Sequence, residues 1–96
     1  MRKIRKQTLA EADLVDVWIY THDRWGEAQA ERYFDELETG INRLTRNPEL
    51  GRPCDQLRDG YRALRINRHI VFYTVDAVAI RIVRVLHDRM DPARRL

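Results

Sequence analysis

The chain has 96 residues, of which 44% are hydrophobic and 34% charged, and its formal net charge is +3. This size and composition predict one domain spanning residues 1–96 and exclude intrinsic disorder. No apolar run approaches the roughly 20 residues of a membrane span, and we find no secretory signal, so we expect a cytoplasmic protein without a membrane partner. The charge is uneven, because residues 9–39 carry nine acidic side chains against two arginines whereas both flanks are basic.

The N-terminal part predicts a short strand followed by a helix. Residues 2–7 alternate weakly around Ile4, as in an edge strand. Thr8, with Glu11 three residues later, has the capping-box pattern of a helix start, and Gly26 ends the helix after about Trp25. Apolar residues at helical spacing form one broad stripe on this helix: Leu14, Val15, Trp18, Ile19, His22 and Trp25.

A second helix is predicted from about Glu27 to Arg46, where Asn47-Pro48 stops it. Its apolar stripe consists of Ala30, Tyr33, Phe34, Leu37, Ile41 and Leu44. Because only one or two residues separate the helices, they should form an antiparallel hairpin.

The last third of the chain has the period of strands. After a long loop at 47–59, strand-like runs cover Gly60–Ile66, His69–Tyr73 and Ile80–His87, with almost no residues between them. In the first run, Leu64 and Ile66 should face one way with Arg62, and Ala63 and Arg65 the other. The order is therefore β-α-α-β-β-β, an α+β fold in which the helical hairpin packs on a small antiparallel sheet with a basic face.

The strands place several arginines on this sheet, namely Arg62, Arg65, Arg68, Arg81 and Arg84. Such fixed cations suit an anion: a nucleic acid, a phosphate or an acidic peptide. Arginines with a histidine as general acid or base would also suit RNA cleavage, and the set for that chemistry would be His87, Arg65 and Arg84. A structural or recognition role for His87 is favoured over catalysis, since no second base is clearly paired with it. His69 is expected to be packed or to face solvent.

Other kinds of site have little support in the sequence. There is no metal-ligand spacing and no phosphate-binding glycine loop, so no metal and no cofactor are expected. The basic face lacks aromatic residues spaced for base stacking, so we expect no direct sequence-specific binding of nucleic acid. Cys54 lies in a loop without an obvious neighbouring base, and we expect an unreactive thiol in a reducing compartment.

Two further features allow either a structural or a functional role. Trp18 and Trp25, seven residues apart, either pack against the sheet or form a groove for a partner helix. The polar tail 87–96 is either a frayed terminus or a recognition element.

The sequence resembles the ParE toxins of type II toxin–antitoxin modules, within the wider RelE/ParE superfamily. The resemblance covers nearly the whole chain, and its most specific parts are Asn47-Pro48 with Leu50-Gly51-Arg52, and Arg84-Val85-Leu86-His87 with Arg89-Met90-Asp91. Further matching segments are Ala12-Asp13-Leu14, Val17-Trp18-Ile19-Tyr20, Trp25-Gly26, Ala30-Glu31-Arg32-Tyr33, Gly60-Tyr61-Arg62 and Arg68-His69-Ile70-Val71-Phe72-Tyr73.

The resemblance implies a cytosolic bacterial toxin that binds and inhibits DNA gyrase and is neutralised by a ParD-like ribbon-helix-helix antitoxin, with no catalysis of its own. The alternatives are a RelE-like endonuclease that cleaves mRNA on the ribosome, or a non-toxic remnant that only binds antitoxin. RelE-type nucleases carry a denser catalytic set, whereas this chain has no lysine after Lys6 and no tyrosine in its tail, which favours the ParE branch.

On this reading the candidate residues fall into two groups. Those expected to bind the antitoxin are Trp18, Trp25, Arg62, Arg65, Arg81 and Arg84. Those expected to bind the target are His87, Arg89, Met90, Arg94 and Arg95.

Overall fold

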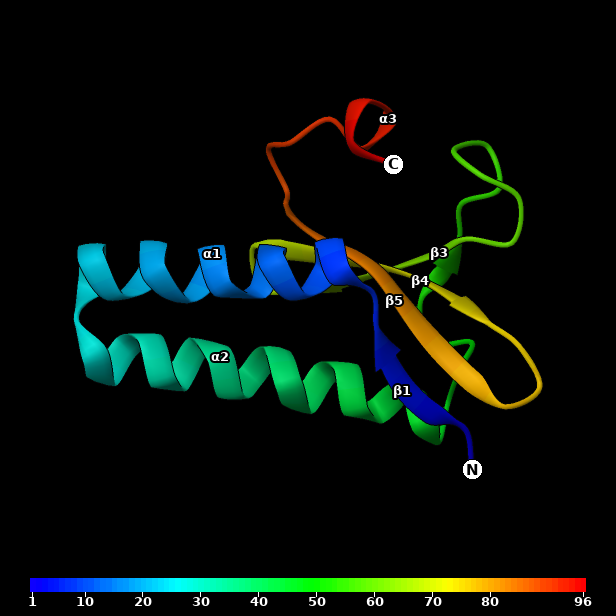
Figure 1. The fold of residues 1–96 in the computed structure, drawn as a ribbon, viewed down its shortest axis with the longest axis horizontal. Helices are drawn as coiled ribbons and strands as arrows, with labels where there is room; N and C mark the ends of the chain where they lie inside the picture. Colours follow the sequence, from blue (N-terminus) through cyan, green and yellow to red (C-terminus); the bar gives the residue numbers. More distant parts are fainter.

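A computed structural model describes residues 1–96 (Figure 1). Its elements in chain order are β1 (Lys3–Lys6), α1 (Thr8–Trp25), α2 (Glu27–Asn42) with a 3-10 turn at Arg43–Thr45, β2 (Arg52–Pro53), β3 (Arg62–Ile66), β4 (His69–Val75), β5 (Ala79–His87) and α3 (Pro92–Arg95). The predicted α+β fold, with a helical hairpin packed on a sheet, is confirmed. No helix combines the length and the apolar character needed to cross a membrane.

The sheet has five strands in the order β1-β5-β4-β3-β2 and is mixed rather than wholly antiparallel. β3, β4 and β5 form the predicted antiparallel meander, and the two-residue strand β2 adds to β3. β1 pairs parallel with β5, with Ile4 opposite Ile80. This pairing arises because the helical hairpin carries the chain from β1 across the sheet before the meander begins, as a crossover connection between parallel strands does.

Helix α1 uses only part of its predicted apolar stripe against the core. Its buried residues are Ala10, Leu14, Val17 and Thr21. Trp18 is half-buried and meets Phe34 of α2 edge-to-face, with ring centroids 5.8 Å apart, while Val15, Ile19 and Trp25 are exposed. The predicted stripe was too broad for one helix interface, so a large part of it faces solvent.

The ends of α1 differ in how far they follow the prediction. Gln7, not Thr8, is the N-cap, and no side chain caps the helix there, so the predicted capping box does not form. Gly26 does end α1, with φ of 89°, a backbone conformation that side-chain-bearing residues rarely adopt.

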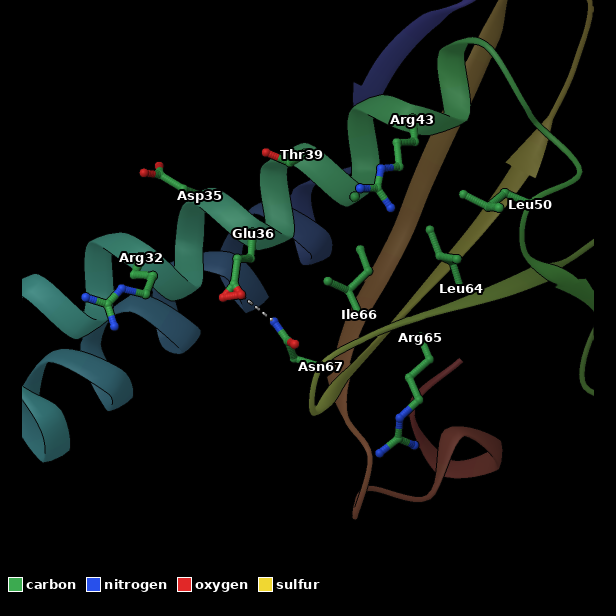
Figure 2. A pocket seen from close by; sticks show the side chains of 11 residues that line it. Arg32, Asp35, Glu36, Thr39, Arg43, Leu50, Leu64, Arg65, Ile66 and Asn67 are labelled. Atoms are coloured by element: carbon green, nitrogen blue, oxygen red, sulfur yellow. Dashed lines mark hydrogen bonds between the residues drawn. The ribbon is translucent and has the colours of Figure 1, made fainter.

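The main core lies between the helical hairpin and one face of the sheet. It contains Ala10, Leu14, Val17, Leu37, Ile41, Leu44, Val71, Tyr73, Ile80, Ile82 and Val85, with Leu64 and Ile66 packed against it. Gly40 allows α2 to approach Ile66 closely, since a Cβ there would collide with the isoleucine side chain. The alternation predicted for β3 is therefore correct, as Figure 2 also shows for Leu64, Arg65 and Ile66.

The opposite face of the sheet is not purely basic. Cys54, Ala63, Phe72 and Leu86 form a second buried cluster, against which Leu57, Tyr61, Ile70 and Leu96 pack. The tail thus ends in a residue that contributes to packing, although its composition predicted a segment too polar to do so. The tail's brief helix, α3, is capped by Asp91, whose carboxylate accepts from the Ala93 N–H at 3.0 Å.

A buried tyrosine fixes the long loop after α2. The Tyr73 hydroxyl is inside the core, donates to the Pro48 carbonyl at 2.7 Å and accepts from the Gly51 N–H at 2.8 Å. A side chain at position 51 would collide with the tyrosine ring, so glycine is required there. These contacts give a structural reason for the Asn47-Pro48 and Leu50-Gly51-Arg52 pattern.

Candidate functional site

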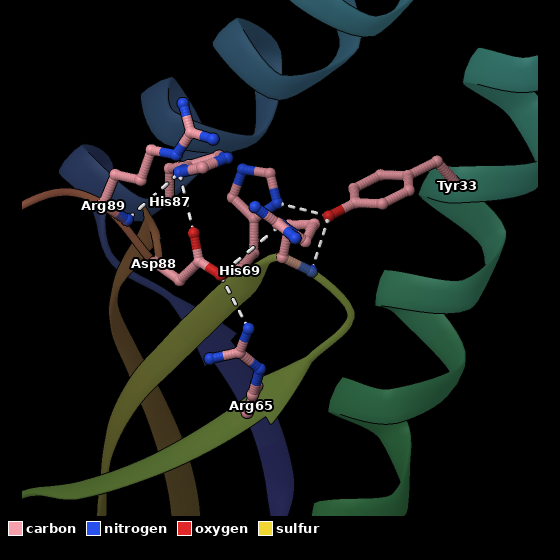
Figure 3. Close-up of polar contacts among 7 residues, drawn as sticks. Tyr33, Arg65, His69, His87, Asp88 and Arg89 are labelled. Carbon is pink, nitrogen blue, oxygen red and sulfur yellow. Dashed lines mark hydrogen bonds and ion pairs between the residues drawn. The ribbon is translucent and has the colours of Figure 1, made fainter.

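Three ionisable rings meet where β4 begins and β5 ends (Figure 3). His69 and His87 are directly opposite each other in the β4–β5 register, with ring centroids 5.3 Å apart. Tyr33 reaches them from α2, and its hydroxyl lies 2.6 Å from His69 Nδ1 while accepting from the Arg68 N–H at 3.2 Å. The tyrosine donates to His69 when the histidine proton is on Nε2, and accepts from Nδ1–H in the other tautomer.

Burial determines the charge of two of these rings. It lowers the pKa of His69 to about 4, helped by the neighbouring His87, so His69 is neutral at physiological pH. Burial also raises the pKa of Tyr33, which keeps its phenol protonated and able to donate. The pair thus supplies a neutral imidazole hydrogen-bonded to a neutral phenol.

Asp88 connects the rings to two arginines. Its Oδ2 accepts from Arg65 at 2.6 Å and lies 3.5 Å from Arg68 Nε, and its Oδ1 is 3.1 Å from His87 Nδ1. Burial by itself would raise the pKa of Asp88, but Arg68, Arg65 and His87 outweigh it and hold that pKa below its ordinary value. The carboxylate is therefore charged throughout the physiological range.

The contacts of His87 Nδ1 leave one atom of Asp88 without a partner. Nδ1 accepts from the Arg89 N–H at 3.1 Å and lies 3.1 Å from Asp88 Oδ1. Asp88 Oδ1 is buried and has no hydrogen-bond donor. A ring that carries its proton on Nδ1 would donate to Oδ1, but the Arg89 N–H would then lose its acceptor.

The nuclease set predicted from the sequence is only partly assembled. Arg65 and His87 both contact Asp88, so they do lie together. Arg84 is instead bound elsewhere: its guanidinium makes two hydrogen bonds to Asp13 of α1, at 2.7 and 2.8 Å, and a third to the Arg95 carbonyl at 2.8 Å. Asp13 also accepts from the Val85 N–H at 2.9 Å, so this pair joins α1, β5 and the tail.

Sequence reasoning missed three members of the cluster: Tyr33, His69 and Asp88. Tyr33 matched a core stripe and His69 a strand start, and nothing local signalled that they would meet. The one available signal was the position of His69 and His87 at the two ends of consecutive strands, which an antiparallel meander brings opposite each other. No group of three or more histidine, cysteine or acidic side chains is arranged to hold a metal ion.

Two of the remaining strand arginines have intramolecular partners. Arg62 donates to the carbonyls of Gly51 and Glu49, at 2.8 and 3.2 Å, and so supports the loop held by Tyr73. Arg81 pairs with Asp76 at 3.0 Å in the β4–β5 turn. Cys54 is buried in the second cluster, and burial raises the pKa of its thiol, which disfavours the reactive thiolate.

The two tryptophans do not share one groove. Trp18 lines a groove of about 680 Å³ along the helical hairpin, together with Lys6, Glu11, Leu14, Val15, Phe34, Asp35 and Glu38. Trp25 lies at the end of α1, where 66% of it is exposed. A different groove, of about 450 Å³, separates α2 from β3, and five of its eleven lining residues are charged. Asn67 reaches Glu36 across it at 3.4 Å (Figure 2).

The predicted target-binding residues lie in and after the last strand. His87 belongs to the cluster described above, Arg89 lies two residues after it, and Met90 is exposed. In α3, the Arg94 side chain is 86% exposed and makes only a distant contact with Asp91, at 3.9 Å. The roles of these residues, and of the six arginines and tryptophans assigned to the antitoxin, stay predictions.

Comparisons with known proteins agree on one family. The model of the "ParE toxin of type II toxin-antitoxin system, parDE" matches residues 4–92. Toxin ParE1 of Mycobacterium tuberculosis is 49% identical over 88 residues, covering 91% of this chain and 90% of that protein. Toxin ParE1 of Caulobacter vibrioides is 41% identical over 96 residues, covering 100% and 99%. Toxin ParE of Escherichia coli is 39% identical over 88 residues, covering 91% and 85%.

The solved structures add a likeness of fold. A chain described as "Chromosomal ParDE TA system from P. aeruginosa" superposes with a TM-score of 0.79 at 21% identity, covering 91% of this chain and 96% of that one. With the family model spanning nearly all residues and relatives above 40% identity at nearly full length, this chain belongs to the ParE toxin family of type II toxin–antitoxin systems.

Proposed function

We propose that this toxin acts in the cytoplasm by binding and inhibiting DNA gyrase and that a ParD-like antitoxin neutralises it. The observation that carries the proposal is the match to ParE toxins over residues 4–92. The ion pair of Arg84 with Asp13 also supports a binding protein over a nuclease. It engages Arg84, which is one of the three residues predicted for RNA cleavage, within the fold.

The antitoxin surface proposed here is the outer face of the helical hairpin. Val15 and Ile19 are more than half exposed there, next to the groove that Trp18 and Phe34 line. Lys6, Glu11, Asp35 and Glu38 form a charged rim around that groove. An amphipathic antitoxin segment that folds on binding can cover such an apolar strip and pair with its rim.

The target surface proposed here is the C-terminal segment. Arg89, Met90 and Arg94 are exposed there, and the antitoxin surface lies on other elements. The toxin would then hold target and antitoxin on different faces. Neutralisation would work by a change in the shape of the target surface or by sequestration of the toxin.

One experiment separates the binding toxin from the ribosome-dependent nuclease. Purified full-length protein should inhibit gyrase supercoiling or trap cleaved DNA, lose this effect on addition of its antitoxin, and leave ribosome-bound mRNA intact. The clustering of His69, His87 and Tyr33 is what favours the nuclease as second candidate. If mRNA is cleaved, and His87→Ala reduces cleavage by about 10²–10⁴-fold, the nuclease replaces the gyrase inhibitor. Antitoxin binding without either activity would identify a non-toxic remnant.

A further inference from the structure

A groove of about 380 Å³ lies between the last turns of α1 and the β3–β4 turn. Its lining residues are Tyr20, Thr21, Arg24, Trp25, Gln29, Tyr33, Arg68, His69, His87 and Arg89. None of these side chains is acidic. We propose that this groove binds a phosphorylated nucleoside, with its phosphate on Arg68 and Arg89 and its base on Trp25 and Tyr20.

The cationic end of the groove has unused donors. Arg89 makes no side-chain hydrogen bond or ion pair, although its backbone N–H is bound to His87. Arg68 contacts Asp88 only through Nε at 3.5 Å, and its side chain is 60% exposed, so its terminal amino groups remain free for an anion. A guanidinium pair of this kind matches the planar, bidentate geometry of phosphate oxygens.

His87 lies next to these arginines. Its ring lines the groove, and its Nδ1 is 3.1 Å from Asp88 Oδ1, an atom with no hydrogen-bond donor. The neutral His69 ring faces His87 at a centroid distance of 5.3 Å. The groove thus presents an imidazole beside its cationic end.

The other end of the groove offers flat, exposed rings. Trp25 and Tyr20 are both more than half exposed, and the Arg24 guanidinium lies 5.3 Å from the Tyr20 ring centroid. Aromatic faces and arginine planes stack on nucleobases of any sequence. An acidic peptide would need the arginines but not these rings, so the combination favours a nucleoside phosphate over a peptide.

The backbone does not oppose a bound anion at this end of the hairpin. The C-terminal turns of α1 carry partial negative charge, but the first turn of α2, which supplies Gln29, carries partial positive charge beside it. The two helix ends offset each other, and the three arginines of the groove determine its potential. The site does not depend on a gyrase target or on the antitoxin surface.

Binding to the purified full-length protein tests the proposal, with AMP, adenosine, inorganic phosphate and a single-stranded ten-nucleotide RNA as probes. Calorimetry and tryptophan fluorescence should show AMP binding at least about tenfold more tightly than adenosine or phosphate. The double variant Arg68→Ala/Arg89→Ala should weaken AMP binding by about tenfold or more. Trp25→Ala should weaken AMP binding about fivefold and leave phosphate binding unchanged.

Arg58→Ala, which removes an exposed arginine from the loop before β3, is the matched control and should bind AMP as the parent does. RNA binding much tighter than AMP binding would support a nucleic-acid strand as the source of the nucleoside phosphate, and equal binding would support a free nucleotide. The proposal is wrong if neither AMP nor RNA binds the parent protein, or if Arg58→Ala weakens binding as much as the double variant. Circular dichroism on each variant checks that folding is retained.

Discussion

At the scale of single residues, Arg84 forms an ion pair with Asp13 inside the protein, although the sequence suggested that it binds a partner. Only 14% of the Arg84 side chain and 12% of the Asp13 side chain is exposed. The hydrogen bonds to Asp13 raise the pKa of Arg84 above its ordinary value, so the guanidinium stays charged. Each charge compensates the other at a position where either charged side chain, nearly buried without its partner, would destabilise the fold.

Removing either partner should therefore destabilise the protein. Arg84→Ala leaves the Asp13 carboxylate nearly buried and uncompensated, and we expect a loss of about 3 kcal/mol in the free energy of unfolding. Chemical denaturation measures it. Arg81→Ala, which removes an exposed pair with Asp76, is the control and should cost less than about 1 kcal/mol. Equal losses in the two variants would contradict this account.

His69 should make stability depend on pH. Its pKa falls from 6.5 to about 4 on folding, so the unfolded state takes up the proton first. The free energy of unfolding should therefore decrease as pH falls from about 6.5 towards 4, by up to about 3 kcal/mol. Asp88, whose folded pKa is lowered, loses its contribution only at still lower pH.

Denaturation curves between pH 7 and pH 4 measure this dependence. In His69→Asn, the side-chain amide can keep a hydrogen bond to the Tyr33 hydroxyl but does not titrate, so the decrease between pH 6.5 and 4 should be much smaller. His22→Asn, at an exposed position on α1, should keep the parent's pH dependence. A steep decrease that persists in His69→Asn would assign the effect to other groups.

At the scale of elements, α1 presents more apolar surface than its own fold covers. Because Val15 and Ile19 are exposed, Val15→Ser with Ile19→Ser should change the free energy of unfolding by about 1 kcal/mol or less. If the antitoxin covers this face, the same double variant should bind it at least about tenfold more weakly. Leu9→Ser, on a different face of the same helix, is the control and should bind the antitoxin as the parent does. If the parent, the double variant and Leu9→Ser all bind the antitoxin with equal affinity, the face with Val15 and Ile19 is not the antitoxin surface.

The C-terminal segment combines a packing role with a proposed recognition role. Truncation after Asp91 removes Leu96 from the second cluster and the Arg95 carbonyl from Arg84, and should lower the free energy of unfolding by about 1–3 kcal/mol. It should also reduce growth arrest on induced expression while antitoxin binding is kept.

Two point variants separate these effects. Leu96→Ala should lower the melting temperature with little change in toxicity, whereas Arg94→Ala should lower toxicity with no change in melting temperature, because its side chain is almost fully exposed. Full toxicity of the truncated protein would show that residues 92–96 do not contact the target.

At the scale of the whole molecule, a partner should contribute much of the stability of so small a protein. A chain of 96 residues buries a modest fraction of its surface, and this one keeps several large apolar side chains exposed. Antitoxin at 100 times its dissociation constant should add about 2.7 kcal/mol, which corresponds to a rise of about 10–20 °C in melting temperature. Thermal melts with and without antitoxin measure the rise, and an unchanged melting temperature despite binding would mean that the unfolded chain binds equally well.

The sequence by itself determined the order and type of the main elements and the family. Apolar residues at helical spacing identified both helices, Gly26 marked the end of α1, and the alternation of Leu64 and Ile66 with Ala63 and Arg65 correctly assigned the faces of β3. The end predicted for the second helix, at Arg46, was too late, because α2 ends at Asn42 and continues only as a 3-10 turn to Thr45. These features depend on neighbours a few residues apart, which is the range over which periodicity and turn chemistry act.

Only the tertiary structure decided which distant side chains meet. The parallel β1–β5 pairing, the Arg84–Asp13 pair and the cluster of Tyr33, His69 and Asp88 join residues between 19 and 76 positions apart. The aromatic and basic halves of the α1–β4 groove are likewise more than 40 positions apart, so no local spacing could show them together. Such contacts follow from how the helical hairpin docks on the sheet, and the summed burial of many apolar side chains determines that docking. The docked elements then bring each polar group beside a partner from a distant part of the sequence.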